Sequence, residues 1–544
     1  MFDSKSVLDT ESLNEYKKEA TKLTPVLYDE YKSFDVVRVS DFVSKYLSFD
    51  DYILFAGAYH NASLQMLNAM KFEHLYGFDT NGMYNEQSLH DEPGYTKIKY
   101  FRISIEDTHF ASNFFKAIFS LSVIEHLNYS GGDIFDHIER FMREAGRLLE
   151  NNGYLVITTD YNDVPRFKKG QNVFDKEGIL RIIKIAKQFG FELMSEPSFE
   201  IKDKPIYFYH MHYTFIFLAF ILHKETRQAA LTDVNILAPQ NQRDGISIYA
   251  RMLKKRFEDA GIRAQVYASE NEIKNEYPTI LEYFSGKLQK LPKDKKTIIE
   301  MHNTPASSIK RFLYYLFRNR SLETATFSVR QNRELIHYTL LIKAPEMLTG
   351  SLSNVPRYFI MPHIAYPDYG IRAHPNGKCI GTFGFLSRNK RFESICDLAI
   401  RLNVPAIIVM TINDLSPDAR IREYASKIMK KYSSFKNIKI SFGFFTEEEV
   451  LEQLKNCSHI IFNQKNSKIQ TSGSYRFLAQ LGIPIISVDS FQAVESRVYR
   501  VHSLRDVTME YLESIKEPVN QDDGFRYLLN ILRYDLSRAS DEGL

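Results

Sequence analysis

The sequence predicts an α/β fold in which parallel sheets are built from alternating strands and helices. Short continuous apolar runs recur along the chain and alternate with longer segments whose apolar residues have helical spacing. Such continuous runs are typical of strands that helices cover on both faces of a parallel sheet. With 544 residues, the chain is long enough for two or three domains of this kind.

Composition excludes several classes of protein. A hydrophobic content of 44% and an aromatic content of 13% are sufficient for full-sized cores. The formal net charge of +3 is too small to indicate a nucleic-acid-binding protein. The three cysteines are far apart in the sequence and lack metal-ligand spacing, which favours a reduced, cytoplasmic protein.

Nothing in the apolar pattern predicts a membrane span. The N-terminus, Met1-Phe-Asp-Ser-Lys-Ser6, has no apolar signal core. The most apolar run, residues 213–222, is about half the length of a membrane-spanning helix, so we expect a buried strand there. Peripheral contact at the inner membrane face, through a basic or aromatic surface, stays open.

The first predicted unit is centred on the turn at Gly57. Residues 1–48 are polar with loose helical spacing, and we expect either a lid or a packing extension. A strand over 52–55, the glycine turn and a helix over 62–72 come next, and a second strand ends before Asp79. Asp79 follows Gly57 by about 22 residues, the spacing of a nucleotide-binding βαβ unit, although a full glycine fingerprint is missing.

Two later motifs specify this unit further. The segment Phe115–Leu127 ends in Ser122-Val-Ile-Glu-His-Leu127, and a helix over 133–150 and a strand from Tyr154 follow it. Together with the acid-tipped second strand, this order of motifs resembles class I S-adenosylmethionine-dependent methyltransferases of polysaccharide gene sets. The resemblance implies a Rossmann-like, seven-stranded methyltransferase domain over residues 49–225, with residues 213–222 as the antiparallel seventh strand.

The resemblance implies S-adenosylmethionine as the cofactor and suggests its binding residues. Gly57 would let the backbone approach the cofactor, and Asp79 would bind the ribose hydroxyls, unless it only caps the next helix. Glu106 and Asp107 follow the third strand, where this family contacts adenine, but Ser104 stands where the usual acid is expected.

Glu125 and His126 allow three interpretations. A Glu-x-x-Glu-His pattern holds a divalent cation in some relatives, but Ser122 replaces the first glutamate here, so we predict no metal. His126 is then a candidate general base, or a structural histidine.

After a linker at 224–232, the second half resembles a GT-B glycosyltransferase of the GT4-like kind. The resemblance rests on a first turn at Arg243-Asp-Gly-Ile-Ser247, a strand at Thr297–Met301 before His302, and a strand and turn over 380–391. It implies two further Rossmann-like domains, an acceptor domain over 233–370 and a nucleotide-sugar domain over 371–544.

This second resemblance implies a nucleotide-diphosphate sugar as co-substrate. His302 would lie at the acceptor site, and the donor would contact five residues, namely Lys390, Ser472, Gly473, Ser474 and Arg476. For each, a capping, solvated or structural role is the alternative. The paired glutamates of this family are missing from the stretch Ile469–Phe477.

The sequence therefore predicts a cytoplasmic two-enzyme fusion that methylates a sugar hydroxyl and transfers a sugar, with a glycan or glycolipid as acceptor. One alternative is an active methyltransferase with a degenerate, glycan-binding second half. Another is a small-molecule or RNA methyltransferase. The acceptor, the donor sugar and the oligomeric state stay open.

Overall fold

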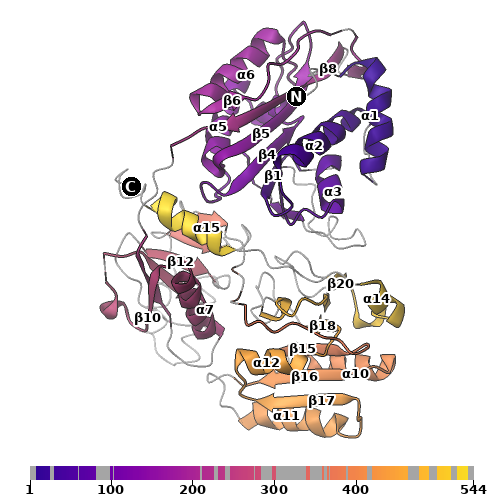
Figure 1. Cartoon of the computed structure of the whole chain (residues 1–544), viewed down its shortest axis with the longest axis vertical. Coiled ribbons are helices and arrows are strands. Elements are labelled where there is room, and N and C mark those ends of the chain that lie inside the picture. Colours follow the sequence, from indigo (N-terminus) through magenta and orange to yellow (C-terminus); the bar gives the residue numbers. More distant parts are fainter. Residues whose placement is uncertain are drawn as a thin grey trace. The chain divides into compact units, whose positions relative to one another are not determined.

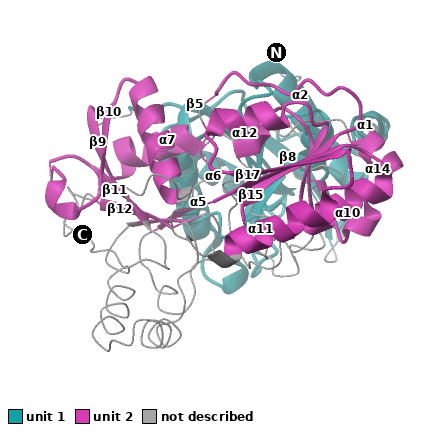
Figure 2. Cartoon of the chain, turned by 90° about the horizontal axis from the view of Figure 1, so that it is seen from below, with its two compact units in different colours: residues 1–228 teal, residues 229–544 magenta. Residues whose placement is uncertain are grey.

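The fold is described from a computed structural model of the whole chain, which divides into two compact units, residues 1–228 and 229–544 (Figure 2). The described residues are 8–24, 30–58, 61–80, 98–101, 103–201, 203–208, 211–225, 231–238, 245–274, 276–283, 297–301, 339–342, 358–360, 364, 366, 368–386, 390–412, 419–463, 477–488, 499–515 and 524–536.

The first unit is built on a single sheet with one antiparallel insertion. Its strands are β1 (Tyr52–Ala56), β2 (His74–Phe78), β3 (Ile98–Phe101), β4 (Phe115–Leu121), β5 (Leu149–Tyr161), β6 (Phe191–Leu193), β7 (Ile206–Phe208) and β8 (Met211–Leu222). The sheet is eight-stranded with the order β3-β2-β1-β4-β5-β8-β6, and β7 pairs with β8 outside that path. Strands β1 to β5 run parallel, and β8 lies antiparallel between β5 and β6.

Helices cover both faces of this sheet. They are α1 (Thr10–Leu23), α2 (Ser33–Tyr46), α3 (Ala62–Ala69), α5 (Ile134–Leu148) and α6 (Lys176–Gln188). Figure 1 shows α1, α2 and α3 on one side of the sheet and α5 and α6 on the other. Phe34 and Phe42 of α2 belong to the same buried core as Phe55 of β1 and Phe119 of β4, so the N-terminal helices complete the core of this unit.

Two strand boundaries differ from the sequence-based expectation. A strand over 154–158 was expected from the apolar run, but β5 continues to Tyr161 because Thr159, Asp160 and Tyr161 pair with β8. The aromatic segment before β8, for which no element was predicted, contains the short strand β7. The extension of β5 begins with the polar residues Thr159 and Asp160, which do not continue an apolar run, so the sequence pattern did not indicate it.

The second unit contains two parallel sheets of six strands each. The first has the order β10-β9-β11-β12-β13-β14. Its strands are β9 (Asp233–Leu237), β10 (Arg263–Tyr267), β11 (Thr279–Tyr283), β12 (Thr297–Met301), β13 (Thr339–Ile342) and β14 (Tyr358–Ile360), and α7 spans Gly245–Asp259. Continuous burial of β12 matches the apolar run expected of a strand covered on both faces.

The second of these sheets has the order β17-β16-β15-β18-β19-β20, the arrangement of a doubly wound nucleotide-binding fold. Its strands are β15 (Ile380–Phe385), β16 (Ala406–Thr411), β17 (Ile438–Gly443), β18 (His459–Phe462), β19 (Ile485–Val488) and β20 (Tyr499–Val501). Its helices include α10 (Phe392–Leu402), α11 (Ala419–Tyr432), α12 (Glu447–Leu454) and α14 (Met509–Ser514).

Two contacts in this unit join parts of the chain that are far apart in the sequence. Helix α15 (Gly524–Asn530) contacts α7, where the rings of Phe525 and Phe257 lie 5.0 Å apart. The buried thiols of Cys379 and Cys457, which are 78 residues apart in the sequence, have a sulfur–sulfur distance of 3.8 Å. No helix in the described ranges is both long and apolar enough to cross a membrane.

We predict that Gly57→Ala destabilises the first unit by about 2–5 kcal/mol. Gly57 has φ +67, and a Cβ built there would lie 2.3 Å from Cγ2 of Val123. A left-handed backbone costs a non-glycine residue roughly 1–2 kcal/mol, and overpacking adds about 1–3 kcal/mol. Urea unfolding measures the change. Gly261→Ala, in the second unit, is the control, because Gly261 has a similar φ of +75 but open space around it; an equal loss in both variants would contradict the clash argument.

Candidate functional site

The turn after β1 is tied to the end of β2. The backbone N–H groups of Gly57 and Ala58 both donate to the carbonyl oxygen of Phe78, at 2.8 and 3.1 Å. Ala56 and Phe78 are register partners, so Gly57 and Asp79 follow neighbouring strand ends at the same edge of the sheet. The half-buried Asp79 in turn donates its backbone N–H to the carbonyl oxygen of Phe101 in β3. The structure thus brings these two predicted residues together.

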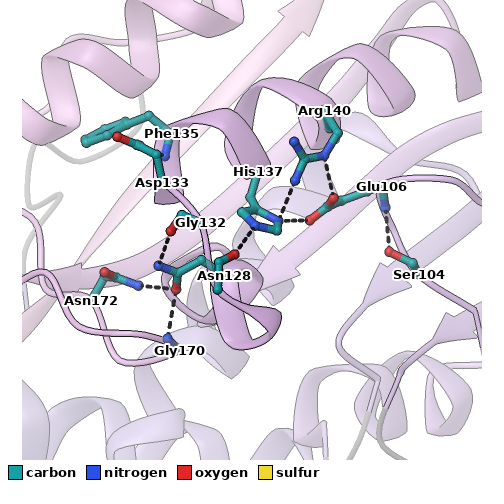
Figure 3. Close-up of polar contacts among 11 residues, drawn as sticks. Ser104, Glu106, Asn128, Gly132, Asp133, Phe135, His137, Arg140, Gly170 and Asn172 are labelled. Atoms are coloured by element: carbon teal, nitrogen blue, oxygen red, sulfur yellow. Dashed lines mark hydrogen bonds and ion pairs between the residues drawn. The ribbon is translucent and has the colours of Figure 1, made fainter.

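Glu106 and Asp107 have different surroundings after β3. The carboxylate of Glu106 bridges to α5, with one oxygen 2.6 Å from Nδ1 of His137 and the other accepting from Nε of Arg140 at 2.8 Å (Figure 3). The side chain of Asp107 is mostly exposed, and its nearest described partner is Nε2 of His109, 3.7 Å away. Because both oxygens of Glu106 are engaged, this side chain holds α5 to the loop.

His126 lies just beyond β4, in the 3-10 helix η2 (Ile124–Ser130). Its Nδ1 lies 2.8 Å from the carbonyl oxygen of Gly170, and the side chain is 45% exposed. A carbonyl oxygen can only accept, so Nδ1 must carry a proton and donate it. In the neutral ring, Nε2 is therefore the unprotonated nitrogen, and this geometry suits a base.

The loop after β5 is clamped onto η2 by two asparagines that the sequence analysis missed. The Nδ2 of the buried Asn172 donates to the carbonyl oxygen of Glu125 at 2.6 Å and to Oδ1 of Asn128 at 2.9 Å. Oδ1 of Asn128 also accepts from the backbone N–H of Gly170 at 2.8 Å (Figure 3). Gly170 is the residue whose carbonyl oxygen holds His126, so this asparagine clamp sets the orientation of the imidazole.

Glu125 is completely buried beneath His126. Thr159 donates its hydroxyl to one carboxylate oxygen at 2.9 Å. The other oxygen, Oε1, has no hydrogen-bond partner in the described structure and lies 4.0 Å from Nε2 of His126. Burial raises the pKa of Glu125, while the neighbouring His126 opposes that rise. The sequence of the motif Ser122–Leu127 does not indicate that Glu125 is buried; the fold shows it.

Asp160 is a second buried acid close to this site. Burial and the repulsion of Glu125 raise the pKa of Asp160 well above its usual range, and Asp35 of α2 adds to the rise. Lys32, beside α2, opposes it. Residues 159–165 have the composition of a polar loop, whereas the structure buries Asp160 in strand β5.

Within the described residues, no group of three or more His, Cys, Asp or Glu side chains is arranged to hold a metal ion. The two buried acids near His126 are Glu125 and Asp160. The positive charge that acts on both of them is the ammonium group of Lys32.

In the second unit, Lys390 follows β15 and precedes α10. It lies where the strand order of its sheet reverses, between β15 and β18, the position at which such sheets bind ligands. Burial lowers the pKa of Lys390 to about 8. Beside this position, Asn463 after β18 donates to Ser394 of α10 at 2.7 Å, and its own buried Oδ1 has no hydrogen-bond partner in the described structure.

The other predicted residues of the second unit cannot be placed. His302, which follows β12, lies outside the described residues, as do Ser472, Gly473, Ser474 and Arg476.

We predict that Asp160→Asn makes the stability of the first unit less dependent on pH. Relative to the original protein, the variant should therefore be more stable at pH 8 than it is at pH 5. The pKa of Asp160 is higher in the folded protein than in the unfolded chain, so the folded protein binds the proton more tightly. Stability therefore falls as pH rises from the unfolded pKa through the folded pKa. Asparagine removes the charge and this dependence. Thermal unfolding of both proteins across pH 5–8 tests it, with the exposed Asp163→Asn as control; a steeper loss of stability with pH in Asp160→Asn would contradict the assignment.

Comparison with known proteins identifies one domain. Residues 56–157 match a family described as "Methyltransferase domain". The matched range runs from the end of β1 into β5 and includes Gly57, Asp79, Glu106, Asp107 and His126. No curated protein matches the chain significantly.

Several solved structures that are similar to part of the chain are described as methyltransferases. One from Methanosarcina mazei is 14% identical, with a TM-score of 0.27, and covers 34% of this chain and 98% of its own. One from Listeria monocytogenes is 10% identical, with a TM-score of 0.25, and covers 35% and 99%. A geranyl diphosphate C-methyltransferase from Streptomyces coelicolor A3(2), in complex with Mg²⁺, geranyl diphosphate and S-adenosyl-L-homocysteine, is 11% identical, with a TM-score of 0.28, and covers 41% and 92%.

The family match begins at the last residue of β1 and includes β2, β3, β4 and part of β5. The first unit therefore contains a methyltransferase domain over residues 56–157.

Proposed function

We propose that the chain acts in glycan biosynthesis as a methyltransferase of sugar hydroxyls joined to a glycosyltransferase. The observation that carries the methyltransferase part is the pairing of Gly57 and Asp79 at one sheet edge, with the open Nε2 of His126 beyond the next strand. A hydroxyl acceptor must lose a proton when it is methylated, and an amine or carbanion acceptor would need His126 less.

The residues at the edge fit the cofactor. S-adenosylmethionine, when bound, supplies a methyl group on a sulfonium, from which a neutral thioether departs. Gly57 has no side chain and a backbone φ of +67, so the turn can bring its backbone close to a ligand. A carboxylate at the position of Asp79 can accept hydrogen bonds from two ribose hydroxyls. Asp107 and the backbone near Glu106 are the proposed contacts to adenine.

In this proposal His126 is the base. Gly170 holds Nδ1 protonated, so Nε2 can take the proton of the acceptor hydroxyl as the oxygen attacks the methyl carbon. The carboxylate of Glu125, near Nε2, would stabilise the resulting imidazolium. Since the methyl donor already has a good leaving group, alignment and proton removal are the main tasks of the protein.

For the second unit we propose GT-B-type sugar transfer from a nucleotide-diphosphate donor. Two parallel six-stranded sheets in one unit, the second in doubly wound order, support this proposal. Lys390 lies at the switch point of that sheet, where its ammonium could neutralise a diphosphate together with the N-terminus of α10. The proposed remaining contacts are His302 for the acceptor and Ser472, Gly473, Ser474 and Arg476 for the donor.

One observation favours a second candidate, in which this half only binds glycan. The glutamate pair expected before β19 is missing from the sequence, and those residues normally contact the donor in the family that this half resembles.

We expect Asp79→Ala to raise the Kd for S-adenosylhomocysteine at least tenfold. A charge-assisted hydrogen bond contributes about 1.5–3 kcal/mol, and one or two would be lost. Isothermal calorimetry measures the change, and Asp79→Asn, which keeps the shape, should fall between the two. The control is Asp41→Ala, an exposed acid of α2. If both alanine variants bind like the original protein, the ribose assignment is wrong.

We expect Lys390→Met to weaken binding of uridine or guanosine diphosphate about tenfold at pH 7. The original protein should also lose affinity as pH rises above about 8, where the free amine loses its charge, while the variant should not. Lys439→Met, an exposed lysine of the edge strand β17, is the control. If the full chain binds neither nucleotide, the glycosyltransferase proposal fails and the glycan-binding candidate replaces it.

A further inference from the structure

Exposed apolar side chains gather at the carboxyl edge of the first sheet. Among the described residues of the first unit, six large apolar side chains are exposed, namely Phe49, Tyr129, Val164, Phe167, Leu180 and Tyr207. Four of these lie in segments at this edge: Tyr129 (77% exposed), Val164 (66%), Phe167 (54%) and Tyr207 (59%). Tyr129 is in η2 after β4, the next two are in the loop after β5, and Tyr207 is in β7 beside the start of β8.

These side chains are held in place although they are exposed. The ring of Tyr129 lies over Gly170, where an added Cβ would be 2.5 Å from its Cδ2. The ring of Phe167 contacts those of Phe135 and Phe174, at 5.9 and 6.1 Å. Arg166 and Val173 exchange two backbone hydrogen bonds that close the loop into a hairpin. The protein therefore keeps ordered apolar groups in contact with solvent, an arrangement that is costly unless something covers them.

The same loop is strongly basic. Residues 163–170 carry Arg166, Lys168 and Lys169, and both lysines are exposed. The one acid of the segment, Asp163, has Nζ of Lys204 at 2.8 Å from its carboxylate. The edge thus offers apolar tips beside the two exposed lysines, Lys168 and Lys169.

We propose that this edge binds the surface of an anionic membrane. We call the residues Tyr129, Val164, Phe167, Lys168, Lys169 and Tyr207 the docking edge. Aromatic and aliphatic tips enter the headgroup region, and lysines attract anionic lipid, so the combination fits a membrane surface better than a purely apolar protein partner. The inference rests on the proposed function in one respect, because docking would bring a lipid-linked acceptor toward His126. The imidazole of His126 is hydrogen-bonded to Gly170, the residue that the ring of Tyr129 covers.

A flotation experiment with the full chain tests the charge contribution. The chain should float with vesicles of phosphatidylcholine and phosphatidylglycerol and bind pure phosphatidylcholine weakly. Lys168→Ala combined with Lys169→Ala should lower binding about thirtyfold, since each cation contributes roughly 1 kcal/mol near an anionic surface and 1.4 kcal/mol is tenfold. The matched control is Lys184→Ala with Lys187→Ala, two exposed lysines of α6.

The apolar contribution has its own reporter, because the chain contains no tryptophan. Tyr129→Trp introduces a single fluorophore at the docking edge, and its emission should shift to the blue when anionic vesicles are added. Phe49→Trp places the fluorophore at another exposed aromatic position, before β1, and its emission should not change.

Several results would overturn the proposal. They are no flotation with anionic vesicles, equal losses in the α6 control, or emission of Tyr129→Trp that responds to methyl glycosides and not to vesicles, which would make the edge a glycan site. Calorimetry with S-adenosylhomocysteine separates the two proposals: retained cofactor binding with failed docking rejects the membrane surface alone. If the original protein does not bind S-adenosylhomocysteine, the proposed methyltransferase function is rejected.

Discussion

Parallel pairing of β1, β2, β4 and β5 places the carboxyl ends of all four strands at one edge, and every candidate group of the first unit depends on that register. Gly57 and Asp79 meet because Ala56 and Phe78 are partners. His126 and Asn128 follow β4, and Asn172 follows β5. A shift of one residue in any pair would turn buried side chains to the wrong face, so the packed core also fixes the site.

Burial of charge is the second constraint on this site. Burial raises the pKa of both Glu125 and Asp160, and repulsion by Glu125 raises the pKa of Asp160 further. The protein offsets part of this cost with the hydroxyl of Thr159 and with Lys32 beside α2. Helix α2 therefore has two roles, because Phe34 and Phe42 complete the core while Lys32 and Asp35 act on the charges at the end of β5.

In the second unit, too, the order of the strands brings together side chains that are far apart in the sequence. Its second sheet places Lys390 and Asn463 at the ends of the two strands that flank the reversal of strand order, although 73 residues separate them in the sequence. Burial of Lys390 weakens its own charge and makes it responsive to a bound anion, since an anion would restore the favourable charged form. This is the physical link between strand order and a phosphate-binding role.

Sequence alone determined the alternation of strands and helices, since continuous apolar runs and helical apolar stripes are local patterns. It also determined that Gly57, Asp79 and His126 follow strand ends in the first unit. Tertiary structure decided what those residues touch. The extension of β5 to Tyr161, the burial of Glu125 and Asp160, and the hold of Asn172 on η2 all depend on partners at least 34 residues away. Local propensity carries no information about such distant partners, because burial and hydrogen bonding are settled only when the strands pair.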